Sequence, residues 1–200
     1  MSVADYTAYP YSRGTTHITG PNLNDPLDFD VGFFTDKDDI DLKKQIWAYK
    51  KQREIMRRTH MYRGELAIGH PKFPDGSGAA CVDMTSPSYQ NGVGSDIRDL
   101  EYSADDNKAI EQFLRENINT TWHSLGTAKM APRAQKGVVD QDLTVYGVER
   151  LKVVDLSIAP ENVGANTNNT ALVIGEKGAD IILKELGLVK GYSKKTKLPS

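Results

Sequence analysis

The spacing of apolar residues predicts a long helix near the start of the chain. Over about residues 39–59, Leu42, Ile46, Tyr49 and Met56 recur at the spacing of one helical face. The opposite face carries basic side chains, and we interpret it as a solvated surface rather than a membrane or nucleic-acid contact. These basic residues are Lys43, Lys44, Lys50, Lys51 and Arg53.

Start and stop signals support this helix and predict two more. Asp38 and Asp39 lie at the start of the first helix, where a carboxylate can cap the helix and interacts favourably with the positive end of its dipole. Residues 103–106, Ser-Ala-Asp-Asp, form a capping box with Asp in the reciprocal position. The third helix follows the cap of residues 166–169 and stops at Gly187. The apolar face of the second helix is Ile110, Phe113, Leu114 and Ile118, and the apolar set of the third is Leu172, Val173, Ile174, Ile181, Ile182 and Leu183.

Other segments have strand-like patterns. Residues 15–19 are β-branched, and residues 27–31 alternate apolar and acidic, which is typical of a half-exposed strand. Residues 138–148 predict two short strands. Residues 151–158 are the most apolar run and predict a strand buried on both faces, as in a parallel sheet. Asp155 interrupts that run, and a buried carboxylate is costly without a partner or ligand.

The intervening residues 62–100 are rich in Gly and Pro and predict a long functional or covering loop. His60 and His70 have no Cys, Asp or Glu at metal-binding spacing, so we expect structural or exposed roles and no metal site. Cys81 is the only cysteine, which excludes an internal disulfide and fits a reducing compartment. We interpret it as a small buried hydrophobe.

Composition narrows the possible partners. The 200 residues carry a formal net charge of −2, which favours neither nucleic acid nor an anionic membrane. No apolar run is long enough to span a bilayer, and the first residues lack the pattern of a signal peptide. A chain of this length can bury one good hydrophobic core, or one and a half.

The main chemical candidates are an imidazole, His123, and an amide, Asn166. His123 follows the aromatic Trp122 and precedes a Gly-Thr pair. Each residue has a plainer interpretation when taken alone: His123 as a core histidine, and Asn166 as a helix cap. Asp155, likewise, could simply accept hydrogen bonds from loop amides.

The order of several motifs resembles one family, the glucose–methanol–choline (GMC) oxidoreductases. Residues 122–130, Trp-His-Ser-Leu-Gly-Thr-Ala-Lys-Met, are similar to the family signature His-x-x-Gly-Thr-x-x-Met. The apolar run at 151–160 and the helix at 166–177 follow in the family's order. Upstream, the Ser-Arg-Gly at 12–14 is similar to that of the family's substrate domain. Residues 47–55, with 63–65 and 69–71, look most like the fungal alcohol (methanol) oxidases. Choline dehydrogenase-like enzymes are among the broader relatives.

The resemblance implies an α+β or α/β fold with two parts and a tail. Residues 1–120 would belong to an antiparallel-sheet substrate domain. Residues 121–187 would carry the active site and the closing strand and helix of a Rossmann-like FAD domain. Residues 188–200 would be a basic, mobile tail.

The resemblance also implies an activity, which is FAD-dependent oxidation of a small primary alcohol to an aldehyde. Hydride would pass to flavin N5, and oxygen would be reduced to hydrogen peroxide. His123 would be the catalytic base, with Asn166 as the second active-site residue. Asp155, Ala165, Asn166 and Thr167 would contact FAD, and Trp122 would line the substrate pocket. The implied partners are the alcohol and oxygen, with no nucleic acid or membrane, and the full-length parent could form a homo-oligomer.

One departure from the family pattern leaves alternatives open. The sequence contains no Gly-x-Gly-x-x-Gly, the loop through which these enzymes bind the FAD pyrophosphate. We therefore interpret the chain as the C-terminal part of such an enzyme. The alternatives are an inert scaffold or binding module, and an FAD-dependent dehydrogenase with another electron acceptor. The resemblance implies an intracellular location, in the peroxisome or cytoplasm, although the last residues do not match a Ser-Lys-Leu address.

Overall fold

Helix α1 (Ile40–Arg57) is the longest element of the first of two units, Met1–Thr120 and Thr121–Ser200. The computed structural model describes residues 3–60, 62–82 and 98–188. The predicted tail, apart from Leu188, and the stretch containing Gly92 and Gly94 lie outside these residues. None of the helices in the described ranges combines the length and apolarity that a bilayer crossing requires.

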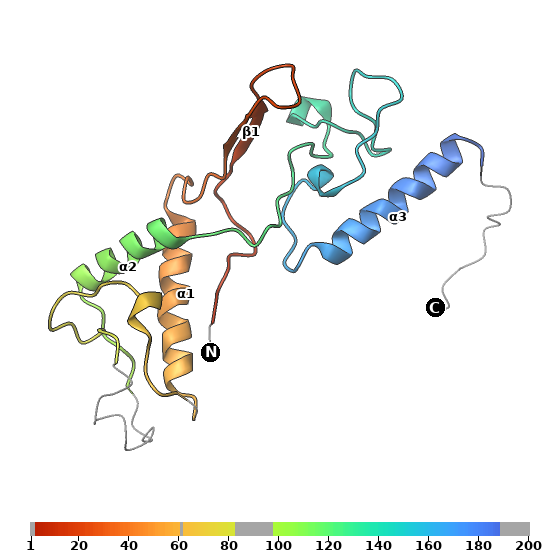
Figure 1. Cartoon of the computed structure of the whole chain (residues 1–200). Coiled ribbons are helices and arrows are strands. Elements are labelled where there is room, and N and C mark those ends of the chain that lie inside the picture. Colours follow the sequence, from red (N-terminus) through yellow and green to blue (C-terminus); the bar gives the residue numbers. More distant parts are fainter. Residues whose placement is uncertain (1–2, 61, 83–97, 189–200) are drawn as a thin grey trace, which may run out of the picture. The chain divides into compact units, whose positions relative to one another are not determined.

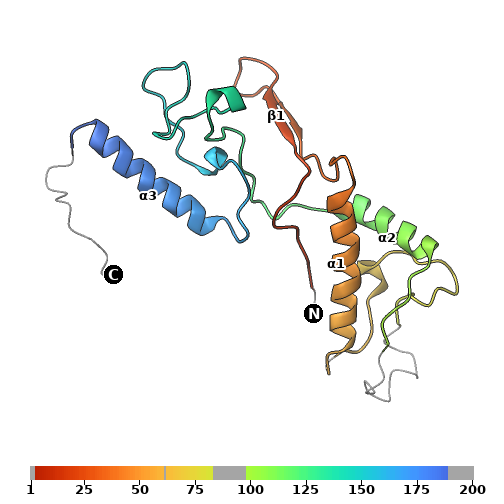
Figure 2. The ribbon, with the colours of Figure 1, turned by 180° about the vertical axis from the view of Figure 1, so that it is seen from behind.

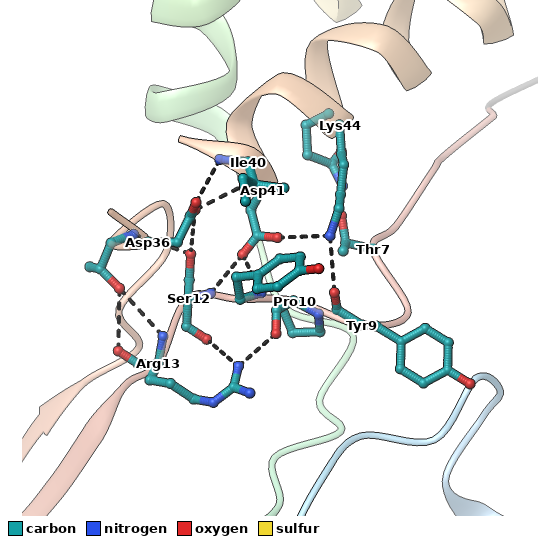
Figure 3. A network of polar contacts seen from close by, with 12 residues as sticks. Thr7, Tyr9, Pro10, Ser12, Arg13, Asp36, Ile40, Asp41 and Lys44 are labelled. Carbon is teal, nitrogen blue, oxygen red and sulfur yellow. Dashed lines mark hydrogen bonds and ion pairs between the residues drawn. The ribbon is translucent and has the colours of Figure 1, made fainter. Parts of the chain in front are cut away.

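Helix α1 confirms the first predicted helix, but its cap differs from the expected one. The side chain of Asp39 makes no capping bond. Instead the carboxylate of Asp36 accepts hydrogen bonds from the backbone N–H groups of Ile40, at 2.5 Å, and Asp41, at 3.3 Å (Figure 3). The Asp36 carboxylate folds back over the first turn of the helix and binds N–H groups four and five residues further along the chain. The residues adjacent to the helix start did not indicate this cap.

Asp41 attaches the N-terminal segment to the first turn of α1 (Figure 3). One of its oxygens accepts from the backbone N–H groups of Tyr11, at 2.8 Å, and Ser12, at 2.7 Å, and the other is 3.2 Å from the ammonium of Lys44. Burial alone would raise the pKa of Asp41, but these hydrogen bonds outweigh it and lower the pKa. The ionised carboxylate therefore holds an extended segment that has little apolar packing of its own.

The prediction that Arg53 faces solvent is wrong. Arg53 is only 2% exposed, and its guanidinium donates two hydrogen bonds to the Glu65 carboxylate, at 2.9 and 2.5 Å. A further nitrogen donates to the carbonyl of Ala79 at 2.9 Å. The rings of Phe73 and Tyr102 lie 5.1 and 5.9 Å from the guanidinium carbon. Arg53 is buried because α1 turns Leu42, Gln45, Tyr49 and Arg53 toward the same side.

We expect Glu65→Ala to lower the free energy of unfolding by about 3–5 kcal/mol, because it leaves the Arg53 guanidinium buried without its anion. The matched control is Lys108→Ala, which removes an exposed ion pair with Asp105 and should leave the unfolding midpoint unchanged. Urea unfolding followed by circular dichroism measures both. Equal midpoints for the two variants would show that the buried pair is not a major source of stability.

Two further predicted elements of this unit are confirmed. Strands β1 (Thr15–Ile18) and β2 (Leu27–Asp30) form an antiparallel hairpin. Helix α2 (Ala104–Asn117) begins with the predicted capping box, in which Ser103 and Asp106 exchange hydrogen bonds. Helix α2 packs against α1, as Figures 1 and 2 show from opposite sides. The short helix η1 (Ala67–Gly69) lies in the described part, residues 62–82, of the predicted long loop.

The second unit has a small apolar core rather than a sheet. Its buried residues are Val139, Leu143 and Ile158, and Ile174 and Ile181 of helix α3 (Asn168–Glu185) pack against them. The two strands predicted over 138–148 are reduced to isolated bridges, which pair Met130 with Val139, Val139 with Val145, and Thr144 with Lys152. The short helix η3 (Arg133–Gln135) precedes this region.

The strand predicted at residues 151–158 is also wrong. Only Lys152 makes a bridge, and the run continues into the short helix η4 (Leu156–Ile158). Leu151 is 48% exposed, so the run is not buried on both faces. Asp155 is exposed, and its carboxylate caps η4 by accepting from the backbone N–H of Ser157 at 2.7 Å. The β-branched residues indicated a strand, but this local cap and the core contacts of Ile158 favour a turn.

Helix α3 ends as predicted, at a left-handed Gly187 with a φ of 63°. Along its inner face, Gly178 is buried against Val154, and a Cβ at that position would overlap the Val154 side chain. Gly175 lies on the same helix with open space around its Cα. The helix can approach Val154 closely at Gly178 because a glycine has no side chain.

These two glycines provide a matched pair of substitutions. We expect Gly178→Ala to lower the free energy of unfolding by about 1–3 kcal/mol, because the added methyl must displace Val154. Gly175→Ala should raise it by about 0.5–1 kcal/mol, since alanine restricts the unfolded chain and meets nothing in the helix. Thermal unfolding of both variants measures the difference. Similar shifts for the two would contradict the close packing of α3 on Val154.

Candidate active site

The structure brings together His123 and Asn166, the two residues that the sequence indicated as candidate catalytic residues. The side-chain amide nitrogen of Asn166 lies 2.9 Å from Nε2 of His123, a hydrogen bond between residues 43 positions apart. His123 is half-buried and Asn166 is exposed. Both belong to the second unit, and their contact therefore does not depend on the first.

Backbone hydrogen bonds hold the His123 segment beside η4. The N–H groups of Gly126, Ala128 and Met130 donate to the carbonyls of Leu156, Ser157 and Ile158, at 3.3, 2.9 and 2.7 Å. Gly126 has a φ of 82°, a conformation that L side chains rarely adopt. The glycine of the Gly-Thr pair therefore lets the chain turn three residues after the histidine.

The orientation of the Asn166 amide follows from the start of α3. The backbone N–H of Asn168 donates to the Asn166 side-chain oxygen at 2.9 Å. A backbone N–H can only donate, so the oxygen must face Asn168 and the NH₂ must face His123. The amide can only donate to His123, and Nε2 must accept. This hydrogen bond therefore favours the tautomer that carries its proton on Nδ1.

Asn166 thus combines two interpretations that the sequence left as alternatives. Its oxygen caps the first turn of α3, and its nitrogen binds the imidazole. The N-cap position itself is Thr167, whose side chain makes no capping bond. Sequence reasoning missed the part played by the backbone of Asn168. The Asn-x-Asn spacing is the only signal for it, because an Asn side chain commonly bonds the N–H two residues on.

The remaining predicted site residues lie near the pair in sequence but make different contacts. Trp122 is 80% exposed and has a left-handed backbone, with a φ of 57°. Thr167 is buried, and Ala165 is exposed. The carboxylate of Asp155 is occupied with the Ser157 N–H and the Ser157 hydroxyl, and these bonds lower its pKa. The structure joins His123 and Asn166 directly, whereas FAD contacts by the other residues stay predictions.

We expect ¹⁵N NMR of the imidazole ring to show His123 as the tautomer protonated on Nδ1. The His123→Gln variant identifies the resonance among the four histidines. Asn166→Ala should reduce the population of this tautomer, because the donor that faces Nε2 is removed. An unchanged tautomer ratio in Asn166→Ala would show that the amide does not determine the protonation site.

Comparison with known proteins defines the class to which this arrangement belongs. Residues 10–175 match the family model described as GMC oxidoreductase, and the chain belongs to that family. Among solved structures, an FAD-dependent oxidoreductase from Chaetomium thermophilum matches with a TM-score of 0.63 and 28% identity. That match covers 90% of this chain and 26% of the other. The formate oxidase of Aspergillus oryzae RIB40 shows the same fold, with a TM-score of 0.64, 20% identity, and coverage of 90% and 26%.

Within the family, the curated relatives include fungal alcohol oxidases. Alcohol oxidase 1 of Komagataella phaffii is 39% identical over 226 residues, and the alcohol oxidase of Candida boidinii is 35% identical over 227. Choline oxidase of Arthrobacter globiformis is 27% identical over 183 residues, covering 91% of this chain and 28% of that enzyme. The match to each alcohol oxidase covers 94% of this chain but 34% of the relative. The chain therefore spans about a third of the length of these relatives.

Proposed function

We propose that this chain supplies two groups of an FAD-dependent alcohol oxidase: the base, and the amide that binds the oxygen atom of the alcohol. The observation that supports the proposal is the hydrogen bond between Asn166 and Nε2 of His123, with the amide oriented by Asn168. It is supported further by the family match and by the fungal alcohol oxidases among the relatives. The substrate would be a small primary alcohol, and oxygen would be the electron acceptor.

The chemistry follows from the lone pair on Nε2. Oxidation of an alcohol requires removal of the hydroxyl proton as hydride leaves the carbon. His123 can accept that proton at Nε2 once the Asn166 NH₂ releases the Nε2 lone pair and turns toward the alcohol oxygen. The Asn166 NH₂ would then donate to the alcohol oxygen as negative charge develops there, and it cannot compete for the proton. General base catalysis of this kind contributes about a hundred- to ten-thousand-fold to the rate.

The described residues fit one side of the implied cofactor. FAD, when bound, would accept the hydride at N5. Gly164, Ala165 and Asn166 are exposed, and the first two have small or absent side chains, so a planar ring could approach their backbone. The Gly-x-Gly-x-x-Gly loop is missing from the sequence, so the pyrophosphate would be held by other residues. In this proposal, 1–120 contribute to a substrate domain and 121–187 return to a Rossmann-like FAD domain.

The second candidate is an inert scaffold or binding module derived from the family. That candidate and the oxidase differ in their response to loss of His123. A dehydrogenase with another acceptor would share the base and differ only in its reaction with oxygen.

In a flavin-loaded protein that carries this sequence, we expect His123→Ala to slow flavin reduction by an alcohol at least about a hundred-fold. Stopped-flow absorbance without oxygen measures this single step. His60→Ala replaces an exposed histidine of the first unit and serves as the control. Added imidazole should restore part of the rate to His123→Ala. Near-normal reduction by His123→Ala would exclude His123 as the base.

A further inference from the structure

His70 and Tyr49 form a titratable pair that the proposed chemistry does not use. Nδ1 of His70 lies 2.8 Å from the hydroxyl oxygen of Tyr49, and the two rings meet edge to face with their centroids 5.9 Å apart. Tyr49 is 3% exposed and His70 is half-buried. The pair joins α1 to the segment of residues 62–82, and both residues belong to the first unit, which does not contain His123.

The direction of the hydrogen bond follows from the surroundings of Tyr49. Burial raises the pKa of its phenol, so the hydroxyl keeps its proton at neutral and acidic pH. That proton needs an acceptor, and in the part of the chain that the structure describes the hydroxyl has Nδ1 of His70 as its hydrogen-bond partner. Tyr49 therefore donates, and the neutral imidazole carries its proton on Nε2. An imidazolium has an N–H on each nitrogen and cannot accept this bond.

The charged groups around His70 also oppose a second cation. Arg53 of α1 and Glu65 act on the imidazole, but the Arg53 guanidinium already binds both oxygens of the Glu65 carboxylate. Burial, together with the Arg53 charge, outweighs Glu65 and lowers the pKa of His70. Among the described residues, Cys81 and Tyr102 are the other titratable groups beside this pair. Burial raises the pKa of both, so they stay uncharged at neutral and acidic pH.

Two polar contacts fix the chain on either side of His70. Before it, Glu65 accepts from Arg53 at 2.9 and 2.5 Å, and after it the Ser77 hydroxyl donates to the Asp106 carboxylate at 2.6 Å. Burial would raise the pKa of Glu65, but its hydrogen bonds with Arg53 outweigh burial and lower the pKa. The Ser77 hydrogen bond likewise lowers the pKa of Asp106. Both contacts therefore persist in mildly acidic solution.

The stretch between these two contacts has few other attachments. Leu66 is 67% exposed and Ile68 is 94% exposed, so its large apolar side chains do not hold it. Within residues 66–72, all of which the structure describes, His70 and Pro71 are the covered residues and the others are exposed. The closed position of this stretch therefore depends largely on the contact of His70 with Tyr49.

We propose that residues 66–72 form a pH-sensitive loop, which the Tyr49–His70 hydrogen bond holds against α1 and which opens when His70 is protonated. The contacts of Glu65 and Ser77 stay in place and limit the opening to this loop. Because burial lowers the pKa of His70 below the ordinary value of about 6.5, the bond contributes fully above that pH and progressively less below it. The proposal concerns the first unit alone and does not depend on the proposed oxidation.

NMR spectroscopy of the 200-residue chain between about pH 7.5 and about pH 5 tests the proposal. The ring resonances of His70 should titrate below the ordinary histidine range. The amide hydrogens of Gly69 and His70, which donate to the carbonyls of Leu66 and Ala67 at 2.9 and 3.1 Å, report opening of the loop. After correction for intrinsic rates, their protection should fall about five- to thirtyfold, the upper limit being set by the protonation of a free imidazole. The amide of Ala80 should keep its protection.

Two variants assign the pH dependence to one side chain. His70→Asn places an amide oxygen near the position of Nδ1, so Tyr49 keeps an acceptor that does not titrate. We expect the exchange of the Gly69 amide in this variant to be independent of pH over the range. His60→Gln replaces an exposed histidine that precedes the segment and serves as the control, with the wild-type transition expected.

Three results would overturn the proposal. A transition that persists in His70→Asn would assign the pH dependence to another group. An ordinary His70 titration, or unchanged Gly69 exchange in the wild type, would show that protonation of His70 does not open the loop. Equal loss of protection at Ala80 would show that acid unfolds the whole segment and not this loop.

Discussion

The first unit depends on a buried charge that has all of its partners. Removing a guanidinium from water is costly, and Arg53 is stable at 2% exposure because Glu65, the Ala79 carbonyl and aromatic rings surround it. Burial alone would raise the pKa of Glu65, but the hydrogen bonds and charge of Arg53 outweigh it and lower the pKa. Each ion therefore keeps the other charged. Because Glu65, Phe73 and Ala79 all come from residues 62–82, these contacts fix that segment against α1.

The second unit is held in place by backbone hydrogen bonds and close packing rather than by a buried ion pair. Its core is small, and the position of His123 depends on backbone hydrogen bonds to η4 and on the close contact of Gly178 with Val154. Neither interaction requires a particular side chain at the site itself. The scaffold can therefore hold an imidazole and an amide in contact while both stay accessible, an arrangement that suits a site for a ligand.

This sequence corresponds to only part of the alcohol oxidases to which it is similar. The family match covers most of this sequence, whereas the sequence covers about a third of the alcohol oxidases. His123 is half-buried and Asn166 is exposed, so a ligand can reach the pair. The proposed oxidation also needs residues that hold the cofactor phosphates, because this sequence has no Gly-x-Gly-x-x-Gly.

The sequence by itself determined the features that depend on local spacing. Helical periodicity, the Ser103–Asp106 capping box, Gly187 and the β-branched strands were predicted because each is a short-range property. The tertiary structure decided what depends on distant partners. Arg53 is buried because Glu65 is present. Residues 151–158 pair with another segment only through the Thr144–Lys152 bridge and then turn into η4, where the Asp155 carboxylate binds the Ser157 N–H. His123 was identified from its motif, but its tautomer follows from Asn166, whose amide nitrogen only the fold brings within 3 Å of Nε2. The backbone of Asn168 then orients that amide.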